Sequence, residues 1–475
     1  MVAGAAARPV HDSTPPAQGF RAGTAWVLSL RREDLPEEVR SQLKRCILDG
    51  LGAALGGRET RTARIAAAFA QEMATAGPAT VFATGARLTV PGAVLANVVA
   101  ANALDIDDGY RPCKGHPGAF IIAPVIAACE DRGVCDLLPA VAAGYELATR
   151  AGVATHRYYD RFHASGSWGP LGTAACVGRV LGLTERQLDN ALGLAEYHAA
   201  LSSIERCLGT PAMTKDGIGW GAYAGACAAY LAARGFTGNP SLFSDPSNAD
   251  LMRDLGERWR VLDLYFKPYS CCRWAQQGVD ALAALRRERR LTLADVDRIL
   301  LHTFREATLL QQTAPRNTEE AQYHLFWPMA AMLAYGDVGP AHVSDEAVRD
   351  PLLLELIARM EAVSEPDIQD RFPAEALGWV EIRLRNGETI RSELTAARGD
   401  AHIPLSDDEI LGKFRQLAEA TLEERTDDVI DAVMNIEAPE SAKRLLQLVG
   451  GLARKPCARG LRAPKTAALD GQGAT

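Results

Sequence analysis

Features that would assign the chain to a membrane, secreted or zinc-binding class are missing from the sequence. No apolar run among the 475 residues is long enough to cross a bilayer, so we expect no membrane partner. The ten cysteines include no Cys-x-x-Cys pair, and the adjacent Cys271 and Cys272 suit neither a zinc site nor a normal disulfide framework. We therefore expect reduced thiols in a cytoplasmic protein without a bound metal.

A strong excess of one charge is also absent. The formal net charge is −8, from 51 lysines and arginines against 59 aspartates and glutamates, which argues against nucleic acid as the main partner. Residues 1–24 lack the compact apolar segment of a signal peptide, so we interpret them as a flexible N-terminal arm. Residues 455–475 are basic and contain glycine and proline, and we interpret them as a disordered tail.

Hydrophobic residues make up 48% of the chain, which is enough for a large core and more than one domain. Residues 25–266 carry one helical pattern after another and predict an all-helical domain. In the first pattern Pro36 opens the helix, Val39 and Leu43 begin a four-residue apolar spacing, and Gly56 ends it. Further helices are predicted over 63–76, 91–104, 124–132, 137–154, 167–181, 185–201 and 220–234.

Strand patterns come later in the chain. Residues 296–304 carry β-branched and aromatic residues, and residues 379–394 alternate around Asn386-Gly387, a strong hairpin signal. Helices are predicted over 320–335, 345–357, 407–421 and 427–436. The fold class is therefore mainly α: a large all-helical domain, a smaller α+β lid domain over 267–405, and C-terminal helices over 406–454 for which packing back on the helical domain is one arrangement.

The loop over 102–118 gathers ionisable side chains between apolar, alanine-rich flanks. It contains Asp105, Asp107, Asp108, Lys114 and His116, with prolines and glycines that exclude a regular element. Such clustering costs desolvation energy unless the groups are paired or used. A calcium loop is excluded because its twelfth position would hold histidine instead of glutamate. From the residues alone, a solvated acidic turn and a functional loop both stay open.

Three further segments carry candidate groups. His163 lies in a Gly/Ser loop before a helix, where it could be a general acid or base, or a capping histidine. Lys215 also precedes a helix and could bind a carboxylate, or be an exposed surface lysine. Lys267 and Arg273 lie where the helical region gives way to the α+β region, and could clamp an anion or form a structural ion pair.

Together these segments resemble the MmgE/PrpD family. The resemblance extends from about Arg31 to Leu448 and rests on motifs in the family's order and spacing. The motifs are Asp105-Ile-Asp107-Asp108 followed by His116-Pro117-Gly118, Phe162-His163 with Gly166, Met213-Thr214-Lys215, Lys267-Pro268-Tyr269 through Arg273, and Ala397-Arg398-Gly399-Asp400 followed by Pro404-Leu405-Ser406.

The resemblance implies a homodimer with a helical domain and an α+β lid, acting on small carboxylates without metal or cofactor. It implies catalytic roles for Asp105, His116, His163 and Lys215. Lys267 and Arg273 match the positions that hold substrate carboxylates in the family.

Three positions depart from the family's pattern. Gly109 stands where a hydroxyl-bearing residue is frequent, Gln276 replaces a histidine, and Trp327 replaces a tyrosine used in cis-aconitate decarboxylase. We expect these three residues to line the substrate site. Losing a hydroxyl and an imidazole while gaining an indole would make that site more apolar and change its substrate.

The expected activity is that of a lyase that moves a proton next to a carboxylate. We place first a dehydratase of the 2-methylcitrate dehydratase type with an altered substrate. An epimerase or isomerase, which reprotonates the same carbanion-like state, and a cis-aconitate-type decarboxylase are alternatives. A non-catalytic carboxylate-binding relative is the alternative of another class.

Overall fold

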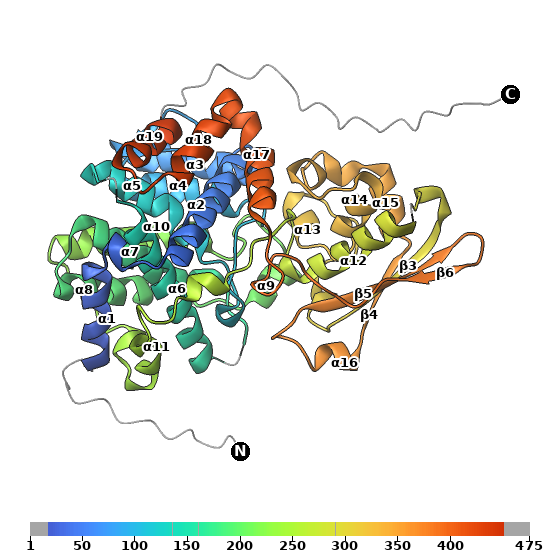
Figure 1. Cartoon of the computed structure of the whole chain (residues 1–475), viewed down its shortest axis with the longest axis horizontal. Coiled ribbons are helices and arrows are strands. Elements are labelled where there is room, and N and C mark those ends of the chain that lie inside the picture. The colour runs from blue at the N-terminus through green and yellow to red at the C-terminus, as the bar shows by residue number, and fades with distance from the viewer. Residues whose placement is uncertain (1–17, 135, 160, 290, 451–475) are drawn as a thin grey trace.

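The chain forms a mainly α-helical domain joined to a smaller α+β domain, which lie side by side along the long axis of Figure 1. The computed structural model describes residues 18–134, 136–159, 161–289 and 291–450. The predicted tail over 455–475 lies outside the described residues, as do residues 1–17 of the predicted arm. No described helix is both long enough and apolar enough to cross a membrane.

The helical domain is built from helices rich in alanine and glycine, which can approach one another closely. Helix α6 packs on α7, α7 on α10, and α10 on α4. A Cβ at Gly225 of α10 would lie 2.4 Å from the carbonyl oxygen of Pro170, so glycine is required for this helix contact. The helices are α1 (Gln18–Ser29), α2 (Glu37–Gly57), α3 (Arg61–Met73), α4 (Val90–Asn102), α5 (Ile122–Arg132), α6 (Leu138–Tyr158), α7 (Gly169–Leu181), α8 (Glu185–Tyr197), α9 (Ile204–Gly209), α10 (Ile218–Ala233) and α11 (Asp250–Arg253).

Two features of this domain differ from the sequence prediction. Helix α1 begins at Gln18, so residues 18–24 belong to a helix instead of a flexible arm. Buried Val27 and Leu30 fix the end of this segment against the core. The domain is also not entirely helical, because β1 (Ala76–Thr80) pairs antiparallel with β2 (Arg87–Leu88). Such short, Gly/Pro-containing strands have no alternating apolar pattern.

The α+β domain has a mixed sheet in the order β4-β3-β5-β6, with β7 paired to β5. Strands β3 and β4 are parallel, and the other pairs are antiparallel. Ile299 and Leu301 of β3 face Ile382 and Val380 of β5, and all four are buried. The strands are β3 (Val296–Thr303), β4 (Met360–Ser364), β5 (Leu377–Leu384), β6 (Thr389–Arg391) and β7 (Thr395–Ala396).

Helices cover the buried face of this sheet. Helix α12 contacts β5, and α14 packs between α12 and α15. The predicted strand over 296–304 and the hairpin at Asn386-Gly387 are confirmed as β3 and β5–β6. The single helix predicted over 320–335 is wrong, because two helices form there. The helices are α12 (Arg273–Arg289), α13 (Thr318–Gln322), α14 (Trp327–Tyr335), α15 (Pro351–Ile357) and α16 (Pro366–Gln369).

After the sheet, the chain returns to the helical domain as α17 (Asp407–Leu422), α18 (Thr426–Met434) and α19 (Pro439–Gly450). Helix α17 packs along α2, with Phe414 and Leu417 against Gly52. Lys413 of α17 forms a buried ion pair with Asp49 of α2. The C-terminal segment therefore packs back on the helical domain.

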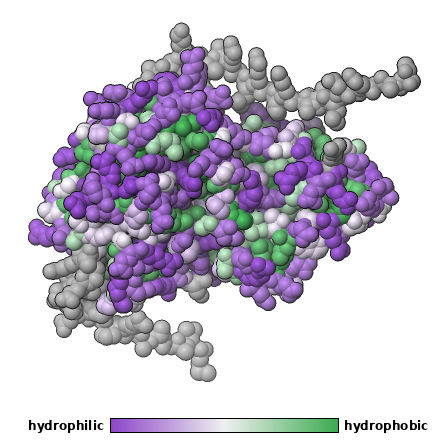
Figure 2. Space-filling view, viewed as in Figure 1, coloured by the Kyte–Doolittle hydropathy of each residue, from purple (hydrophilic) through white to green (hydrophobic). Residues whose placement is uncertain are grey.

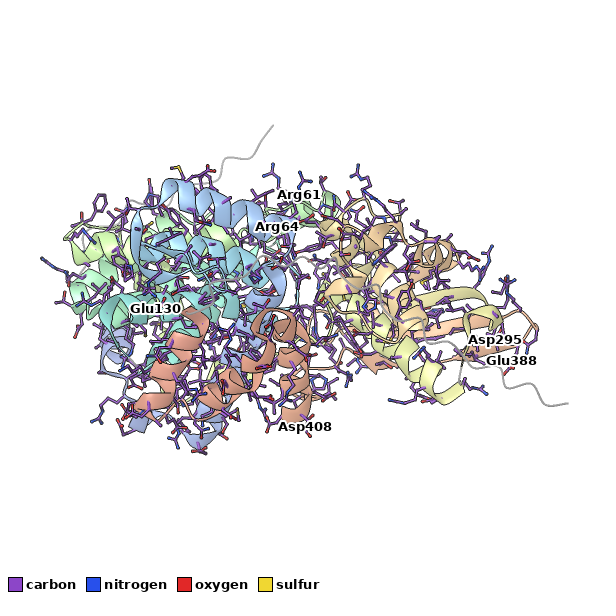
Figure 3. The ribbon with its side chains drawn as sticks, turned by 90° about the horizontal axis from the view of Figure 1, so that it is seen from above. Arg61, Arg64, Glu130, Asp295, Glu388 and Asp408 are labelled. Atoms are coloured by element: carbon purple, nitrogen blue, oxygen red, sulfur yellow. The ribbon has the colours of Figure 1, made fainter. Side chains whose placement is uncertain are left out.

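Other contacts join the domains near the start of α3. Figure 3 shows Arg61 and Arg64 of α3 beside the junction, with Asp295 and Glu388 at the far end of the α+β domain. Between the domains, Thr62 Oγ1 donates to Glu319 Oε1 of α13 at 2.5 Å in a buried position. Hydrophilic residues cover most of the face in Figure 2, with smaller apolar patches among them.

Candidate active site

Strained backbone marks the candidate site. Asp105, Lys114 and Lys215 have φ values of +52°, +56° and +44°, and they are three of the five non-glycine residues with positive φ in the described part of the chain. Residues other than glycine rarely adopt a positive φ, because the conformation is strained. Such residues cluster at functional sites, where the surrounding structure holds them in the strained conformation.

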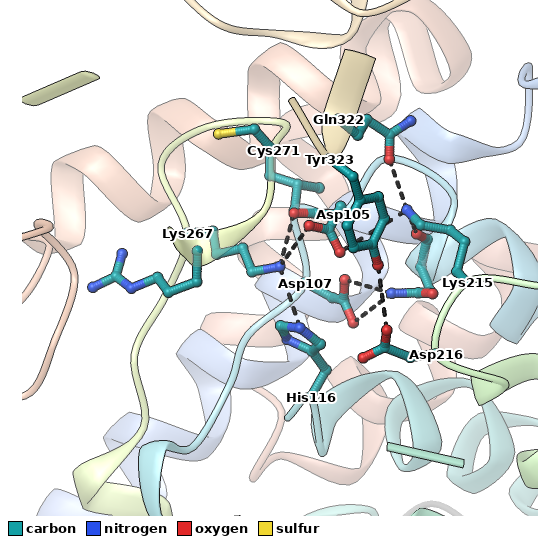
Figure 4. A network of polar contacts seen from close by, with 12 residues as sticks. Asp105, Asp107, His116, Lys215, Asp216, Lys267, Cys271, Gln322 and Tyr323 are labelled. Atoms are coloured by element: carbon teal, nitrogen blue, oxygen red, sulfur yellow. Dashed lines mark hydrogen bonds and ion pairs between the residues drawn. The ribbon is translucent and has the colours of Figure 1, made fainter. Parts of the chain in front are cut away.

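Asp105 lies fully buried between two lysines (Figure 4). Its Oδ2 is 3.3 Å from Lys267 Nζ and its Oδ1 is 3.9 Å from Lys215 Nζ. Burial disfavours the charged carboxylate, but the charges of Lys267 and Lys215 overcome this effect and lower the pKa of Asp105. Asp105 is therefore an anion held inside the protein.

The two lysines are held in turn by backbone and amide oxygens. Lys215 Nζ donates to the carbonyl of Asn102 at 2.6 Å and to Gln322 Oε1 at 2.7 Å. Lys267 Nζ donates to the carbonyl of Asp105 at 2.9 Å. Oδ1 of Asp105 has no hydrogen-bond partner among the described residues, although it is buried. A buried acceptor without a donor is costly and fits a position that meets a bound molecule.

His116 lies on the other side of Lys267. Its Nδ1 is 2.8 Å from the carbonyl oxygen of Asp108, so Nδ1 carries the hydrogen and Nε2 is the acceptor in the neutral imidazole. Nε2 is 3.5 Å from Lys267 Nζ. The imidazole therefore has the tautomer that can accept a proton at Nε2.

Asp108 anchors the loop behind His116. Its Oδ2 accepts a hydrogen bond from the Tyr145 hydroxyl at 2.6 Å, and its Oδ1 accepts from the Gly118 backbone at 2.8 Å. Burial and the nearby charge of Asp49 raise the pKa of Asp108 to about 8.

The pKa of a second carboxyl group, that of Asp216, is shifted in the opposite direction to the pKa of Asp105. It follows Lys215 and is buried, with its oxygens 3.2 Å from Ser165 Oγ and 3.3 Å from the Tyr323 hydroxyl. Burial and the nearby negative charge of Asp105 raise the pKa of Asp216. Two carboxyl groups whose pKa values are moved apart suit separate acid and base roles.

A cavity of about 690 Å³, mouth included, lies beside these groups between the two domains; Lys215 and Lys267 are not among the residues that line it. One end is polar and contains Asp105, His116, Asp216 and Tyr323. The other end is aromatic and is formed by Phe162 of the helical domain with Trp274 and Phe372 of the α+β domain. Clefts between domains with a few convergent polar groups are common small-molecule sites.

Comparison with known proteins agrees with this arrangement. Residues 23–250 match the MmgE/PrpD N-terminal domain and residues 269–436 match the MmgE/PrpD C-terminal domain. The chain belongs to the MmgE/PrpD family. Human cis-aconitate decarboxylase is 26% identical over 88% of this chain and 91% of its own length. The cis-aconitate decarboxylase-like protein oryM of Aspergillus oryzae is 23% identical over 93% and 99%, and cis-aconitate decarboxylase of Aspergillus terreus is 21% identical over 91% and 96%.

Within this MmgE/PrpD chain, the structure brings four of the residues singled out from the sequence together: Asp105, His116, Lys215 and Lys267. Arg273 also borders the cavity. Its guanidinium group donates to Asp400 and to backbone carbonyls, and lies 4.6 Å from the centre of the Tyr265 ring.

His163 is not among the residues that line the cavity. Its ring lies 5.0 Å from that of Tyr159 and 5.9 Å from that of His156, and its Nδ1 is 2.8 Å from the carbonyl of Arg161. The neighbouring Phe162 faces the cavity instead. The structure therefore does not place His163 among the other acid–base groups; its backbone pairs with that of Ser203, and its ring is buried beside those of Tyr159 and His156.

The three departures from the family's pattern lie at different depths. Trp327 is fully buried away from the cavity, with Nε1 donating to the carbonyl of His342 at 2.8 Å. Gln276 is also fully buried and accepts a hydrogen bond from Arg273 at 2.7 Å, so it orients the guanidinium group and does not line the cavity. Contrary to the prediction, the side chains of Trp327 and Gln276 therefore do not line the cavity.

Gly109 is also not among the residues that line the cavity, but it shapes the cavity through Tyr265. Its backbone pairs with that of Tyr265 through two hydrogen bonds, of 2.9 and 2.8 Å. A Cβ at residue 109 would lie 2.1 Å from the Tyr265 ring, so the phenol occupies the space that a side chain there would need. Tyr265 lines the cavity, and its hydroxyl lies where a side chain at residue 109 would be, the position at which the family frequently has a hydroxyl-bearing residue.

Sequence reasoning missed several cavity residues, among them Tyr265, Tyr323, Asp216 and Arg111. Only Gly109 gave a signal, because a glycine in a packed polar loop can indicate close approach of another group. The described residues contain no group of three or more histidine, cysteine, aspartate or glutamate side chains arranged to bind a metal ion.

Proposed function

We propose that this protein is a lyase that transfers a proton at the carbon next to a carboxylate of a small organic acid. The observation that carries this proposal is the placement of anionic Asp105 between two buried lysines, beside a histidine whose Nε2 can accept a proton. Family membership and the decarboxylase names of the relatives support the lyase class.

The residues divide the work between charge stabilisation and proton transfer. Lys267 lies behind the cavity next to both Asp105 and His116, so its positive charge can stabilise negative charge that develops beside His116 during the reaction. His116 exchanges the proton at Nε2. Asp216 and the neighbouring Tyr323 hydroxyl form the acid, because burial favours the protonated form of Asp216.

Two lyase reactions use this arrangement, and we place decarboxylation first because the relatives carry that name. The bond to the departing carboxylate breaks and its electron pair stays on the adjoining carbon. A proton then replaces carbon dioxide there, either one that His116 has first taken up from solvent at Nε2 or the proton of Asp216. In dehydration, His116 instead removes the proton and Asp216 with Tyr323 protonates the departing hydroxyl. The hydrogen bond between these two acids is the observation that favours this second reaction.

Product analysis separates the two reactions. The protein is incubated with hydroxy- and unsaturated di- and tricarboxylic acids, and mass spectrometry follows release of carbon dioxide while absorbance follows alkene formation. Asp216→Asn is expected to lower either rate by about 10²-fold or more, whereas Asp297→Asn, on the outer sheet, leaves it unchanged. Absence of both products with every acid would reject the lyase proposal.

Three further predictions accompany this proposal: a reaction without a cofactor, a homodimer and a cytoplasmic location.

A further inference from the structure

The positive charges around the cavity are nearly all committed to protein groups. Arg111 and Arg273 both pair with Asp400, at 2.5 and 2.8 Å. The guanidinium nitrogens of Arg273 also donate to Gln276 and to backbone carbonyls, which leaves its Nε as the one nitrogen without a partner among the described residues. The two lysines beside Asp105 are equally occupied. Each of these two carboxylates is shared by two cations, so positive charge remains, but most N–H donors of the cations already contact protein oxygens. An acid with three carboxylates would therefore find few free N–H donors.

Lys114 is the exception. It lines the cavity, and its backbone N–H donates to the carbonyl of Arg111, but its ammonium group takes part in no ion pair or hydrogen bond within the described residues. Its φ of +56° holds it in a strained conformation, and its ammonium group lies 4.2 Å from the centre of the Phe162 ring. A strained cation beside the acid–base groups is positioned to meet one anionic group of a ligand.

The wall next to Lys114 is apolar. The rings of Phe162 and Trp274 meet edge to face with centroids 5.6 Å apart, and those of Phe162 and Phe372 stack at 6.2 Å. All three side chains are partly buried and border the cavity, together with Ile204 and Leu208. Binding to a surface of this kind is favoured when the ligand buries an apolar group against it, and is favoured little by a carboxylate.

We infer that the substrate of the proposed lyase carries one carboxylate that binds near Lys114 and His116, and an apolar, ring-sized group that packs on Phe162, Trp274 and Phe372. This inference rests on the proposed function and names its substrate class. It separates this chain from an enzyme built for a small tricarboxylate.

Calorimetric titration with three probe acids tests the inference: propanoate, 3-phenylpropanoate and propane-1,2,3-tricarboxylate. The phenyl acid is expected to bind about tenfold or more tightly than propanoate, because an apolar pocket rewards added apolar area to this extent. Lys114→Met is expected to weaken its binding by about tenfold, and Phe372→Leu by about threefold or more. Trp220→Leu, at an exposed indole on α10, is the matched control and keeps the affinity of the native protein.

Circular dichroism checks that each variant is folded, and Lys114→Gln serves if Lys114→Met is not. Tighter binding of the tricarboxylate, or unchanged affinity in both cavity variants, would overturn the inference. Deuterium exchange from D₂O, followed with the same acids, addresses the proposed function separately. Exchange into the tricarboxylate but not the phenyl acid leaves the lyase standing and rejects the apolar substrate. Preferential binding of the phenyl acid without exchange in any acid of this class rejects the lyase.

Discussion

Asp105→Asn removes one charge from the centre of the site with little other change. Asparagine has the same shape and tolerates the positive φ of this position better than most residues, so the substitution isolates the charge. It leaves the ammonium groups of Lys215 and Lys267 buried without their anion. Removing one partner from a buried ion pair costs about 3–5 kcal/mol. Because both lysines keep hydrogen bonds to oxygen atoms, we expect the lower end, about 3 kcal/mol.

Urea unfolding of the native protein and the variant at pH 7 measures this difference. Asp297→Asn is the control, since Asp297 pairs with Arg383 at the surface, where both side chains are well exposed. That pair is expected to contribute less than about 1 kcal/mol. Asp105→Asn should also lower turnover by about 10²-fold or more. A variant as stable and as active as the native protein would show that Asp105 is not the anion that organises the lysines.

Three further predictions follow from neighbouring contacts. Gly109→Ala should displace the Tyr265 ring and lower the free energy of unfolding by about 1–3 kcal/mol, measured by urea unfolding; an unchanged value would refute the contact. Asp108 has a folded-state pKa of about 8, above its unfolded value, so its contribution to stability is lost as pH rises from about 4 to 8. In thermal unfolding, the melting temperature of Asp108→Asn should therefore rise relative to that of the native protein over this range. A difference that stays constant with pH would contradict this prediction. His163→Ala should retain far more activity than His116→Ala in the lyase assay, and equal losses would place His163 in the reaction.

Much of the architecture could be predicted because local patterns determine it. The helices of the larger domain follow apolar spacing, and the β5–β6 hairpin follows Asn386-Gly387. Strand β4 escaped notice because only Met360 of its five residues is buried, so it has no alternation of apolar and polar residues. Its pairing with β3 is decided by tertiary contact.

The cavity was predictable only in part, for a related reason. Asp105 and His116 belong to one loop, and its cluster of charged residues can be recognised in the sequence. The position of Tyr323 depends instead on a turn that divides the predicted helix. His324 Nδ1 accepts hydrogen bonds from the backbone of Phe326 and Trp327, which starts a new helix there. Because of this turn, Tyr323 lies at the cavity and Trp327 is buried in the core. Contacts between residues so distant in sequence as Arg273 and Asp400 leave no local signal.

The central claim is proton transfer at a carbon next to a carboxylate, with His116 as the group that moves the proton. Proton NMR in D₂O tests it directly, with hydroxy-, unsaturated and aryl-substituted carboxylic acids and with His116→Gln beside the native protein. We predict that deuterium enters at that carbon in the recovered acid or the product, and that His116→Gln abolishes it. Deuterium incorporation that persists unchanged in His116→Gln, or that is absent from every acid with the native protein, would contradict the account.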